Sequence, residues 1–455
     1  MIRKRIISKM LFAGAALAVL ASCSESYPGI DYDKTQGKTG IENQDNWSDQ
    51  TPILVFVNEQ NIFTVKTRGL GAFENNDTVN PIRLANSTFY VYAFRDGYST
   101  SGHEELQEQT DFRRSRYSDP NMSGYAIDYE NRHCLLDGLN YDEGCSMKLH
   151  ANGSGRLDYV EYEDNTPTYG DYGDVPYNFF AYYMDDAKIN RTNRKEKGIS
   201  YEVEIDGTQD LMCGYAPNLT EELKKGASSP YWGVWKTLKE EEQNQILNIG
   251  GYSLQAAHRG IHPMINFKHQ LARLTFTAYP GDETASNVIL RKVEVESRYK
   301  GTFTVASRDL SDIGIKFEDE RRPLSLCEAS DGANPCEELQ TYEVTYDDSM
   351  KDMKWYERPS VKVGSSLLVA PDTLYTLNLY WSEWIVRKEG EEPALVEHTN
   401  PIKYALKVDG GFEAGVEYPI MIAIYGSQPI QVFANVEGWK EGDPIKLDDP
   451  GDYDD

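Results

Sequence analysis

Short apolar runs rich in β-branched and aromatic residues recur along most of this chain, and turn-forming residues separate them. Runs of this kind are typical of β-strands. Most connections between consecutive runs are too short for the helical crossovers that parallel strands need, so they favour mainly antiparallel sheets. The runs that we interpret as strands are 52–57, 61–65, 87–94, 175–183, 265–279, 287–295, 301–305, 361–363, 367–370, 373–381, 418–425 and 429–436.

Helical patterns are scarce by comparison. One short candidate is Glu221–Lys225, which Thr220 can cap and Gly226 can end. A second is the mostly polar segment Thr237–Leu247. Both fall within an insertion at about Arg191–Gly250 between strand-rich blocks, so we expect them to decorate the surface. The sequence therefore predicts a mainly β protein with short helical insertions.

The N-terminus is typical of an exported lipoprotein. A basic start is followed by the apolar segment Met10–Leu20, and residues 1–22 are predicted to be a signal peptide. Small residues precede Cys23 in the pattern of a lipobox, which predicts that this cysteine is acylated and anchors the chain in a membrane. An uncleaved membrane helix is the alternative, but a span needs roughly 20 apolar residues and this stretch is shorter.

The rest of the chain divides by composition. Residues 23–51 are polar and rich in Gly, Asp and Asn, which predicts a flexible tether. The breaker pair Pro280-Gly281 separates two strand-rich blocks, which we interpret as an N-terminal β domain at 52–281 and a C-terminal β domain at 282–440. The end of the chain, 441–455, is an acidic tail.

The charge of the chain limits its partners. The sequence carries 46 Lys and Arg against 73 Asp and Glu, a formal net charge of −27. Because such a chain repels phosphate backbones, we expect no nucleic-acid partner.

No motif for catalysis or for nucleotide binding occurs in the sequence. His258, His262 and His269 could supply nitrogens to a metal ion, but Gly260 and Pro263 argue against the helix that the spacing would need. A solvated loop is the simpler interpretation. We therefore predict no catalytic residues, no metal, no cofactor and no enzymatic activity.

Five cysteines follow Cys23, and none has the C-x-x-C spacing of a zinc or redox site. Cys327 and Cys336 flank a turn-rich loop and form our candidate disulfide. Cys134 could likewise pair with Cys145, which would leave Cys213 unpaired. Buried free thiols are the alternative for these residues.

Several motifs occur together in an order that resembles a known family. Beside the lipobox, they are Thr67-Arg68-Gly69, the aromatic strand ending Phe180–Tyr183, the segment Phe267–Phe276 with His-x-x-Ala-Arg, the turn Phe412–Tyr418, and the final strand Ile430–Trp439. In this order the chain resembles the fimbrillins, which are subunits of the type V pili of Gram-negative anaerobes. The likeness spans nearly the whole chain after Cys23.

The resemblance implies two tandem, antiparallel transthyretin-like β-sandwich domains. It also implies that an arginine-specific protease cuts between Arg68 and Gly69, so that the strand at Ile53–Val65 can leave. A strand of another subunit would then fill the empty groove, and head-to-tail repetition would build a fimbria. The candidate donor strand is near the C-terminus, with Ile430, Val432, Ala434 and Val436 as its apolar face.

On this interpretation the protein is a structural subunit at the cell outer membrane that supports adhesion to a host or bacterial surface. Its partners are other fimbrial subunits and, through acylated Cys23, the lipid of the membrane. An uncleaved pilus anchor is one alternative. Another is a lipid-anchored monomer that captures glycans or peptides, with aromatic residues in Tyr169–Tyr177 or Tyr231–Trp235 stacking on sugars. The same aromatic residues could instead belong to the core.

Overall fold

The structure, a computed structural model, describes most of the chain from residue 51 onward. The described residues are 51–58, 87–96, 98–99, 107–108, 110–116, 126–127, 133–139, 143–150, 155–160, 162, 166–170, 175–329, 336–386, 392–425 and 431–434. The predicted signal peptide, nearly all of the tether and the acidic tail therefore lie outside them. So do Cys23, Arg68, Gly69, Ile430 and Val436.

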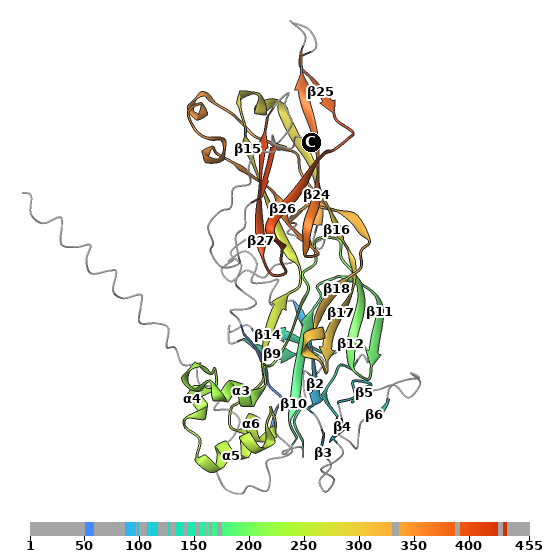
Figure 1. Ribbon diagram of the computed structural model, residues 1–455, viewed down its shortest axis with the longest axis vertical. Coiled ribbons are helices and arrows are strands. Elements are labelled where there is room, and N and C mark those ends of the chain that lie inside the picture. Colours follow the sequence, from blue (N-terminus) through green and yellow to red (C-terminus); the bar gives the residue numbers. More distant parts are fainter. Residues whose placement is uncertain are drawn as a thin grey trace, which may run out of the picture.

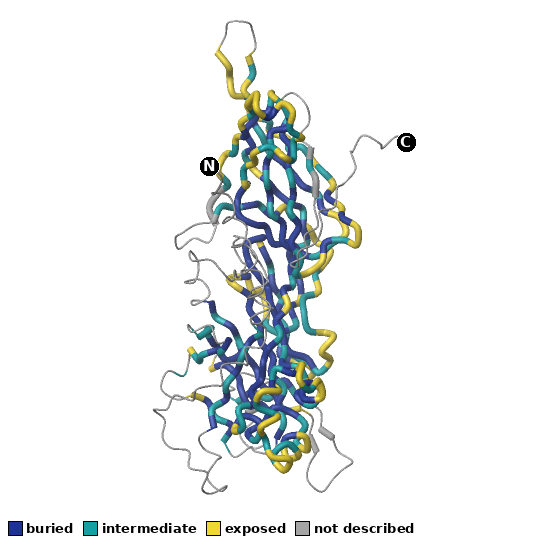
Figure 2. Tube along the Cα trace, turned by 90° about the vertical axis from the view of Figure 1, so that its left-hand side faces the viewer, coloured by how far each residue is buried: buried dark blue, intermediate teal, exposed yellow. Residues whose placement is uncertain are grey.

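Two β-rich lobes follow one another along the long axis of the molecule (Figure 1). Strands predominate and form several separate sheets, so the predicted mainly β fold class is confirmed. Figure 2 shows that buried residues run continuously through both lobes.

A closed ring of seven strands forms the centre of the lower lobe. Its order is β10-β13-β14-β1-β9-β8-β2, and β2 pairs with β10 to close the ring. Closure leaves no strand of the ring with a free edge, and the alternate side chains that point inward fill the interior. The strands are β1 Val55–Val57, β2 Thr88–Arg95, β8 Cys145–Leu149, β9 Arg156–Tyr159, β10 Tyr177–Tyr183, β13 Met212–Tyr215 and β14 Met264–His269; β7 Cys134–Leu136 also pairs with β2.

A second sheet of the lower lobe packs beside this ring. Its order is β11-β12-β17-β18, and the strands are β11 Lys188–Lys195, β12 Gly198–Glu204, β17 Lys300–Ser307 and β18 Gly314–Phe317. Three buried tyrosines join the sheet to the ring, because the hydroxyl of Tyr201 on β12 lies 3.0 Å from that of Tyr92 and 2.9 Å from that of Tyr182.

Helices form one layer against the ring (Figure 1), and in the sequence they lie between β13 and β14. They are α3 Leu219–Lys224, α4 Trp232–Trp235, α5 Glu240–Ile249 and α6 Leu254–His258, with the short helix η2 Gly226–Ser228. Asn218 caps α3 by accepting a bond from the Glu221 backbone, so the predicted cap Thr220 is wrong by two positions. The layer is also more than surface decoration, because Leu223, Ile246 and Leu254 belong to the core cluster of the ring.

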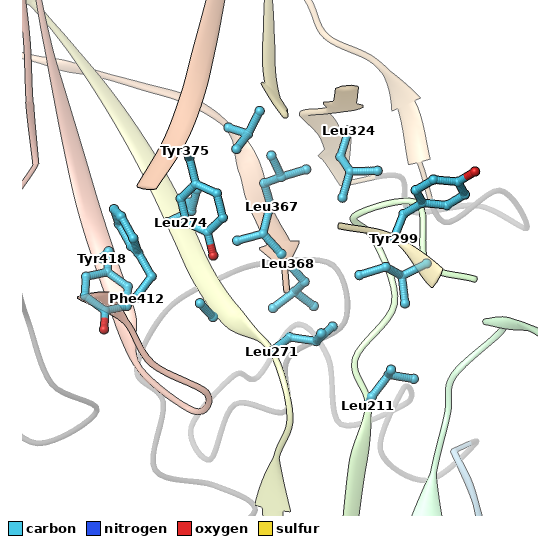
Figure 3. Packing of buried hydrophobic residues seen from close by; sticks show 14 of the residues in the cluster. Leu211, Leu271, Leu274, Tyr299, Leu324, Leu367, Leu368, Tyr375, Phe412 and Tyr418 are labelled. Atoms are coloured by element: carbon cyan, nitrogen blue, oxygen red, sulfur yellow. The ribbon is translucent and has the colours of Figure 1, made fainter. Parts of the chain in front are cut away.

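The upper lobe contains two sheets. The first, β23-β15-β27-β28, comprises β23 Val361–Val369, β15 Ala272–Pro280, β27 Glu417–Ile424 and β28 Gln431–Ala434. The second comprises β19 Arg321–Ser325, β16 Val288–Arg298, β24 Asp372–Ile385, β25 Ala394–Glu397, β22 Tyr342–Glu343 and β26 Ile402–Phe412. Figure 3 shows Leu274, Leu367, Tyr375 and Tyr418 in the apolar core, to which both sheets contribute.

Short elements complete the described chain: β3 Tyr98–Ser99, β4 Gln107–Glu108, β5 Arg114–Ser115, β6 Ala126–Ile127, β20 Cys327–Ala329, β21 Cys336–Glu338, η3 Glu283–Asn287, η4 Leu310–Asp312, η5 Asp348–Met350 and η6 Trp355–Glu357. Most strand pairs are antiparallel, as expected, but β1–β14, β15–β27 and β5–β6 are parallel.

The two lobes share strands and core across the predicted boundary at residue 282. The strands β17 and β18 follow that residue in the chain, yet β17 pairs with β12 of the lower lobe and β18 pairs with β17. One hydrophobic cluster includes Ile199 and Leu211 of the lower lobe together with Leu274 and Leu367 of the upper lobe. The exact domain limits and the transthyretin-like classification of each lobe remain predictions.

Candidate functional site

The strand β1 is one of the seven strands that form the closed ring, and it lies between β9 and β14. Ile53 and Val55 have no exposed surface and Val57 is 3% exposed, whereas the alternate residues Leu54 and Phe56 are half-buried on the outer side. This alternation is the pattern expected of a strand that has one face in a core. The segment therefore contributes three side chains to the interior of the lower lobe.

Backbone hydrogen bonds attach this segment on both sides. On the β14 side the strands are parallel, and on the β9 side they are antiparallel. The bonds are Phe56 N to Pro263 O at 2.9 Å, Asn58 N to Ile265 O at 2.9 Å, Val57 N to Gly155 O at 2.8 Å and Ile53 N to Pro167 O at 2.8 Å; the Tyr159 hydroxyl also donates to Ile53 O at 2.6 Å. If β1 leaves, the backbone groups on both sides of it lose these hydrogen bonds.

Side chains on the outer face of β1 contact two residues in β14 and just before it. The ring of Phe56 lies 5.8 Å from the ring of His262, centroid to centroid. Asn58 donates from Nδ2 to Oδ1 of Asn266 at 3.3 Å. These two contacts, together with the interior positions, define the groove that β1 occupies. We call this space between β9 and β14 the β1 groove.

His262 is buried at the outer wall of the β1 groove. The residue is only 3% exposed, and burial lowers the pKa of its imidazole to about 4. Its backbone carbonyl accepts a bond from the hydroxyl of Tyr231 at 2.9 Å, which ties the groove to the helical layer. The expectation of a solvated loop is therefore wrong for His262.

His269 is buried too, with Nδ1 2.9 Å from a carboxylate oxygen of Asp210, so a solvated loop is also wrong there. Both histidines lie where the chain enters or leaves β14, a strand with two neighbours in the ring. Among the described residues, no group of three or more His, Cys, Asp or Glu side chains is arranged to bind a metal ion.

The candidate donor strand lies at an edge of the upper lobe. Within the described residues, β28 pairs only with β27, with Val432 opposite Ile422 and Ala434 opposite Ile420. Val432 is half-buried. The β28 segment thus has one strand neighbour, whereas β1 has two.

The cleavage and lipidation residues remain predictions, because Arg68, Gly69 and Cys23 lie outside the described residues. Their order in the chain is nevertheless informative. Arg68 follows β1 in the sequence, and all the other strands that the described residues form come after Arg68. A cut there would leave the whole fold in one piece except for β1.

Cysteines behave differently in the two lobes. Cys327 in the upper lobe is disulfide-bonded, and β20 pairs antiparallel with β21, on which Cys336 lies opposite Ala329. The pairing of Cys327 with Cys336 stays a prediction. Cys134 and Cys145 in the lower lobe are free and buried, so a bond between them is excluded. They pair with Phe94 and Val91 of β2, three residues apart, and so point to opposite faces of the sheet.

A buried ion pair in the lower lobe was not predicted from the sequence. Arg194 on β11 and Asp137 are both fully buried, with 2.8 Å between Nη1 and Oδ2. Ser115 donates to the same carboxylate at 2.8 Å, and the Arg194 guanidinium also donates to the carbonyls of Phe112 and Arg114. No spacing in the sequence pairs these residues. The network is fully bonded and has no open side, so we assign it to the architecture of the lower lobe.

A cavity of about 620 Å³ lies between the ends of β2, β10 and β17. Its lining combines aromatic and polar residues, among them Phe94, Tyr215, Asn178, Lys197 and Arg308. The aromatic residues that sequence reasoning named for sugar stacking are elsewhere. Tyr169, Tyr177 and Tyr231 are at most 7% exposed and belong to the core of the ring, while Trp232 is 37% exposed.

No helix among the described residues has the length and apolar character needed to cross a membrane.

Comparisons with known proteins give structural neighbours only. No protein-family model matches the chain, and no curated protein matches it. A solved structure from Bacteroides ovatus, described as a candidate cell adhesion protein, is 12% identical with a TM-score of 0.37 and covers 86% of this chain and 99% of its own. The fimbrial anchor protein Mfa2 of Porphyromonas gingivalis is 11% identical with a TM-score of 0.30, covering 85% and 98%.

The tip fimbrial protein Mfa3 of the same organism, with a C-terminal truncation, is 7% identical with a TM-score of 0.19, covering 85% of this chain and 99% of its own. TM-scores below 0.5 at such identities do not establish a shared fold or function by themselves.

Proposed function

We propose that this protein is a structural subunit of a cell-surface fimbria, assembled head-to-tail by strand exchange, and that it has no enzymatic activity. In this proposal the chain is exported as a lipoprotein and anchored through acylated Cys23 at the outer membrane. Its two lobes are the tandem transthyretin-like domains implied by the fimbrillin resemblance, and the assembled fibre supports adhesion to a host or bacterial surface.

The position of β1 supports the proposal most directly. The strand fills the interior of the lower lobe, yet it precedes Arg68, the residue expected to be cut. Full burial of an aliphatic side chain contributes roughly 1.5–3 kcal/mol. Removal of β1 empties the interior space that three such side chains fill and leaves β9 and β14 each without a strand partner on the groove side, so the emptied groove strongly favours a replacement strand.

A strand from another subunit can supply what β1 supplied. An extended segment that enters the β1 groove gains backbone hydrogen bonds on both sides and buries alternate side chains. The donor in this proposal is the C-terminal segment with Ile430, Val432, Ala434 and Val436. Because donor and groove belong to different lobes, each contact leaves a free groove and a free donor at the two ends, and assembly continues as a filament.

The cavity of about 620 Å³ favours a second candidate function. A concave site with aromatic and polar lining is the usual form of a small-ligand site. In that alternative the protein stays a lipid-anchored monomer that captures glycans or peptides. An uncleaved pilus anchor would likewise retain β1.

One experiment separates these candidates. Cells that express the chain with its own leader are compared with cells that express Arg68→Ala, and the surface protein is analysed by SDS electrophoresis without heating. The proposal predicts an SDS-resistant ladder for the original chain and only a monomer for Arg68→Ala. Lys66→Ala is the matched control, because an arginine-specific protease does not need that lysine.

A ladder that is unchanged in Arg68→Ala would contradict strand release. A monomer for the original chain, with residues 24–68 still attached, would favour the anchor or the monomeric binding protein instead.

A further inference from the structure

Two segments at opposite ends of this chain have nearly the same sequence. Residues 52–58 are Pro-Ile-Leu-Val-Phe-Val-Asn, and residues 429–435 are Pro-Ile-Gln-Val-Phe-Ala-Asn. The two are identical at Pro, Ile, Val, Phe and Asn and differ at two positions. The first segment contains β1, and the second contains β28, part of the candidate donor.

The shared residues are those through which the first segment contacts the groove. Ile53 and Val55 lie inside the ring with no exposed surface. Phe56 contacts the ring of His262, and Asn58 donates to Asn266. Pro52 forms a bridge with Thr168 just before the strand. Pro429, Ile430, Val432, Phe433 and Asn435 repeat these residue types in the same order.

The two differences are tolerable at the positions where they occur. Leu54 is half-buried on the outer side, where the Gln431 amide can reach water. Val57 is an interior residue, and Ala434 at its place would be smaller, so it would leave a small gap but no clash.

We propose that the β1 groove of one copy binds residues 429–435 of a second copy of this same chain, with Val432 in the place of Val55 and Phe433 against His262. This inference rests on the proposed function and adds the partner and the register. The chain would then polymerise with itself, as a repeating subunit does, whereas an anchor or a tip would need only a different subunit on one side.

The register follows from both faces of the strand. A shift by one residue would place Gln431 and Phe433 inside the ring and turn the apolar residues outward. A shift by two residues would place Val432, Ala434 and Val436 inside, which is also apolar. That shift, however, would bring Asn435 to His262 in place of a phenylalanine ring. The shared Phe and Asn therefore select the first register.

The position of β28 in its own copy is consistent with a segment that can be exchanged. It is a four-residue strand with β27 as its strand partner. The strand β27 belongs to the upper lobe, whereas the β1 groove is in the lower lobe. Short edge strands open more easily than internal ones. In the groove of the second copy the same segment would have a strand on each side, which favours the exchanged state.

The test uses the lipidated chain, purified in detergent and cut with an arginine-specific protease, with assembly followed as an SDS-resistant ladder. Phe433→Ala should reduce the rate of ladder formation at least tenfold, because the ring that packs on His262 is lost. Trp384→Ala is the matched control. It removes an aromatic side chain from the same lobe, at a residue that is 42% exposed and outside both segments, and should leave the rate unchanged.

Engineered cysteines test the register independently. In the proposed register Val432 lies opposite Leu157 of the second copy, as Val55 does within one copy. The pair Val432→Cys with Leu157→Cys should therefore form a disulfide between copies, whereas Ala434→Cys with Leu157→Cys should not.

The outcomes distinguish the two proposals. A normal ladder for Phe433→Ala, or a cross-link at position 434 instead of 432, would overturn this register and leave strand exchange intact. If the original chain is cut after Arg68 and forms no ladder at all, then strand exchange itself fails and the register fails with it.

Discussion

The strands contained in the two similar segments, β1 and β28, occupy very different places in the molecule. The first is an internal strand of a closed ring, with backbone bonds to β9 and β14 and side chains buried in the core. The second is β28, which has one strand partner, β27, in the part of the upper lobe that the structure describes. How firmly a strand is held therefore depends on its neighbours as much as on its own residues. A segment that moves from the edge to the ring gains a second neighbour.

A charge placed at equivalent positions of the two segments should change stability most. Val55→Asp buries an unpaired carboxylate inside the ring and should lower the stability of the uncut protein by about 4 kcal/mol or more. Val432→Asp lies at a half-buried edge position, where water can reach the carboxylate, and should cost about 1 kcal/mol. Urea unfolding of both variants at neutral pH measures the difference.

Equal losses of unfolding free energy in the two variants would show that β28 at the sheet edge and β1 in the ring are held with similar strength. The contrast between the two segments would then be wrong. The polymer provides a second readout, because Val432→Asp should prevent the ladder although its monomer stays folded.

An intermediate effect is expected from the disulfide of the upper lobe. Cys327→Ser should lower the stability of that lobe by about 2–3 kcal/mol if the partner is Cys336, since the bond closes a short loop. Peptide mapping of the unreduced protein identifies the partner. Hydrogen exchange resolves the lobes, and the amides of β9 and β14 should keep their protection in this variant.

If β9 and β14 lose protection together with the upper lobe, then the shared hydrophobic cluster makes the molecule one cooperative unit. The ring could not then be treated as a separate site.

The smallest of these effects concerns pH. Burial lowers the pKa of His262 to about 4 while β1 covers it, from the ordinary value of 6.5. Below pH 6.5 the opened or unfolded state binds a proton that the closed state does not bind, so stability falls as the pH decreases toward 4. Between pH 7 and pH 5 this amounts to about 1–2 kcal/mol, from 1.36 kcal/mol per pKa unit.

His262→Leu removes the ionisable group and should flatten that part of the pH dependence, as measured by urea midpoints at pH 7 and pH 5. His398→Leu is the control, because His398 follows β25 in the upper lobe, where its ring stacks on Trp381, and it lies outside the β1 groove. An unchanged slope in His262→Leu would remove His262 as a contributor.

Strands whose hydrophobic pattern is strong could be predicted from the sequence. The aromatic runs at 87–94 and 175–183 became β2 and β10 almost residue for residue. The single strand predicted at 265–279 is instead two strands, β14 and β15, because the chain leaves the ring at Gln270 and enters the upper lobe. No glycine or proline marks that change, so the local sequence carries no signal for it.

Other strands were missed for reasons that differ. β12 alternates Ile199, Tyr201 and Val203 with polar residues, and that signal was present within the segment interpreted as an insertion. β11 is mostly exposed, apart from Arg194, and rich in basic residues, and it is a strand only because β12 pairs with it. The β1 groove could not be predicted either, since β9 and β14 are about a hundred residues apart in the chain.

The most direct test of strand exchange is the N-terminal sequence and intact mass of the protein inside SDS-resistant polymers taken from the cell surface. Strand exchange predicts an N-terminus at Gly69, with residues 24–68 absent from every polymerised copy. Polymers whose subunits still carry acylated Cys23 and the whole β1 segment would contradict it, because the groove between β9 and β14 would then never have been free.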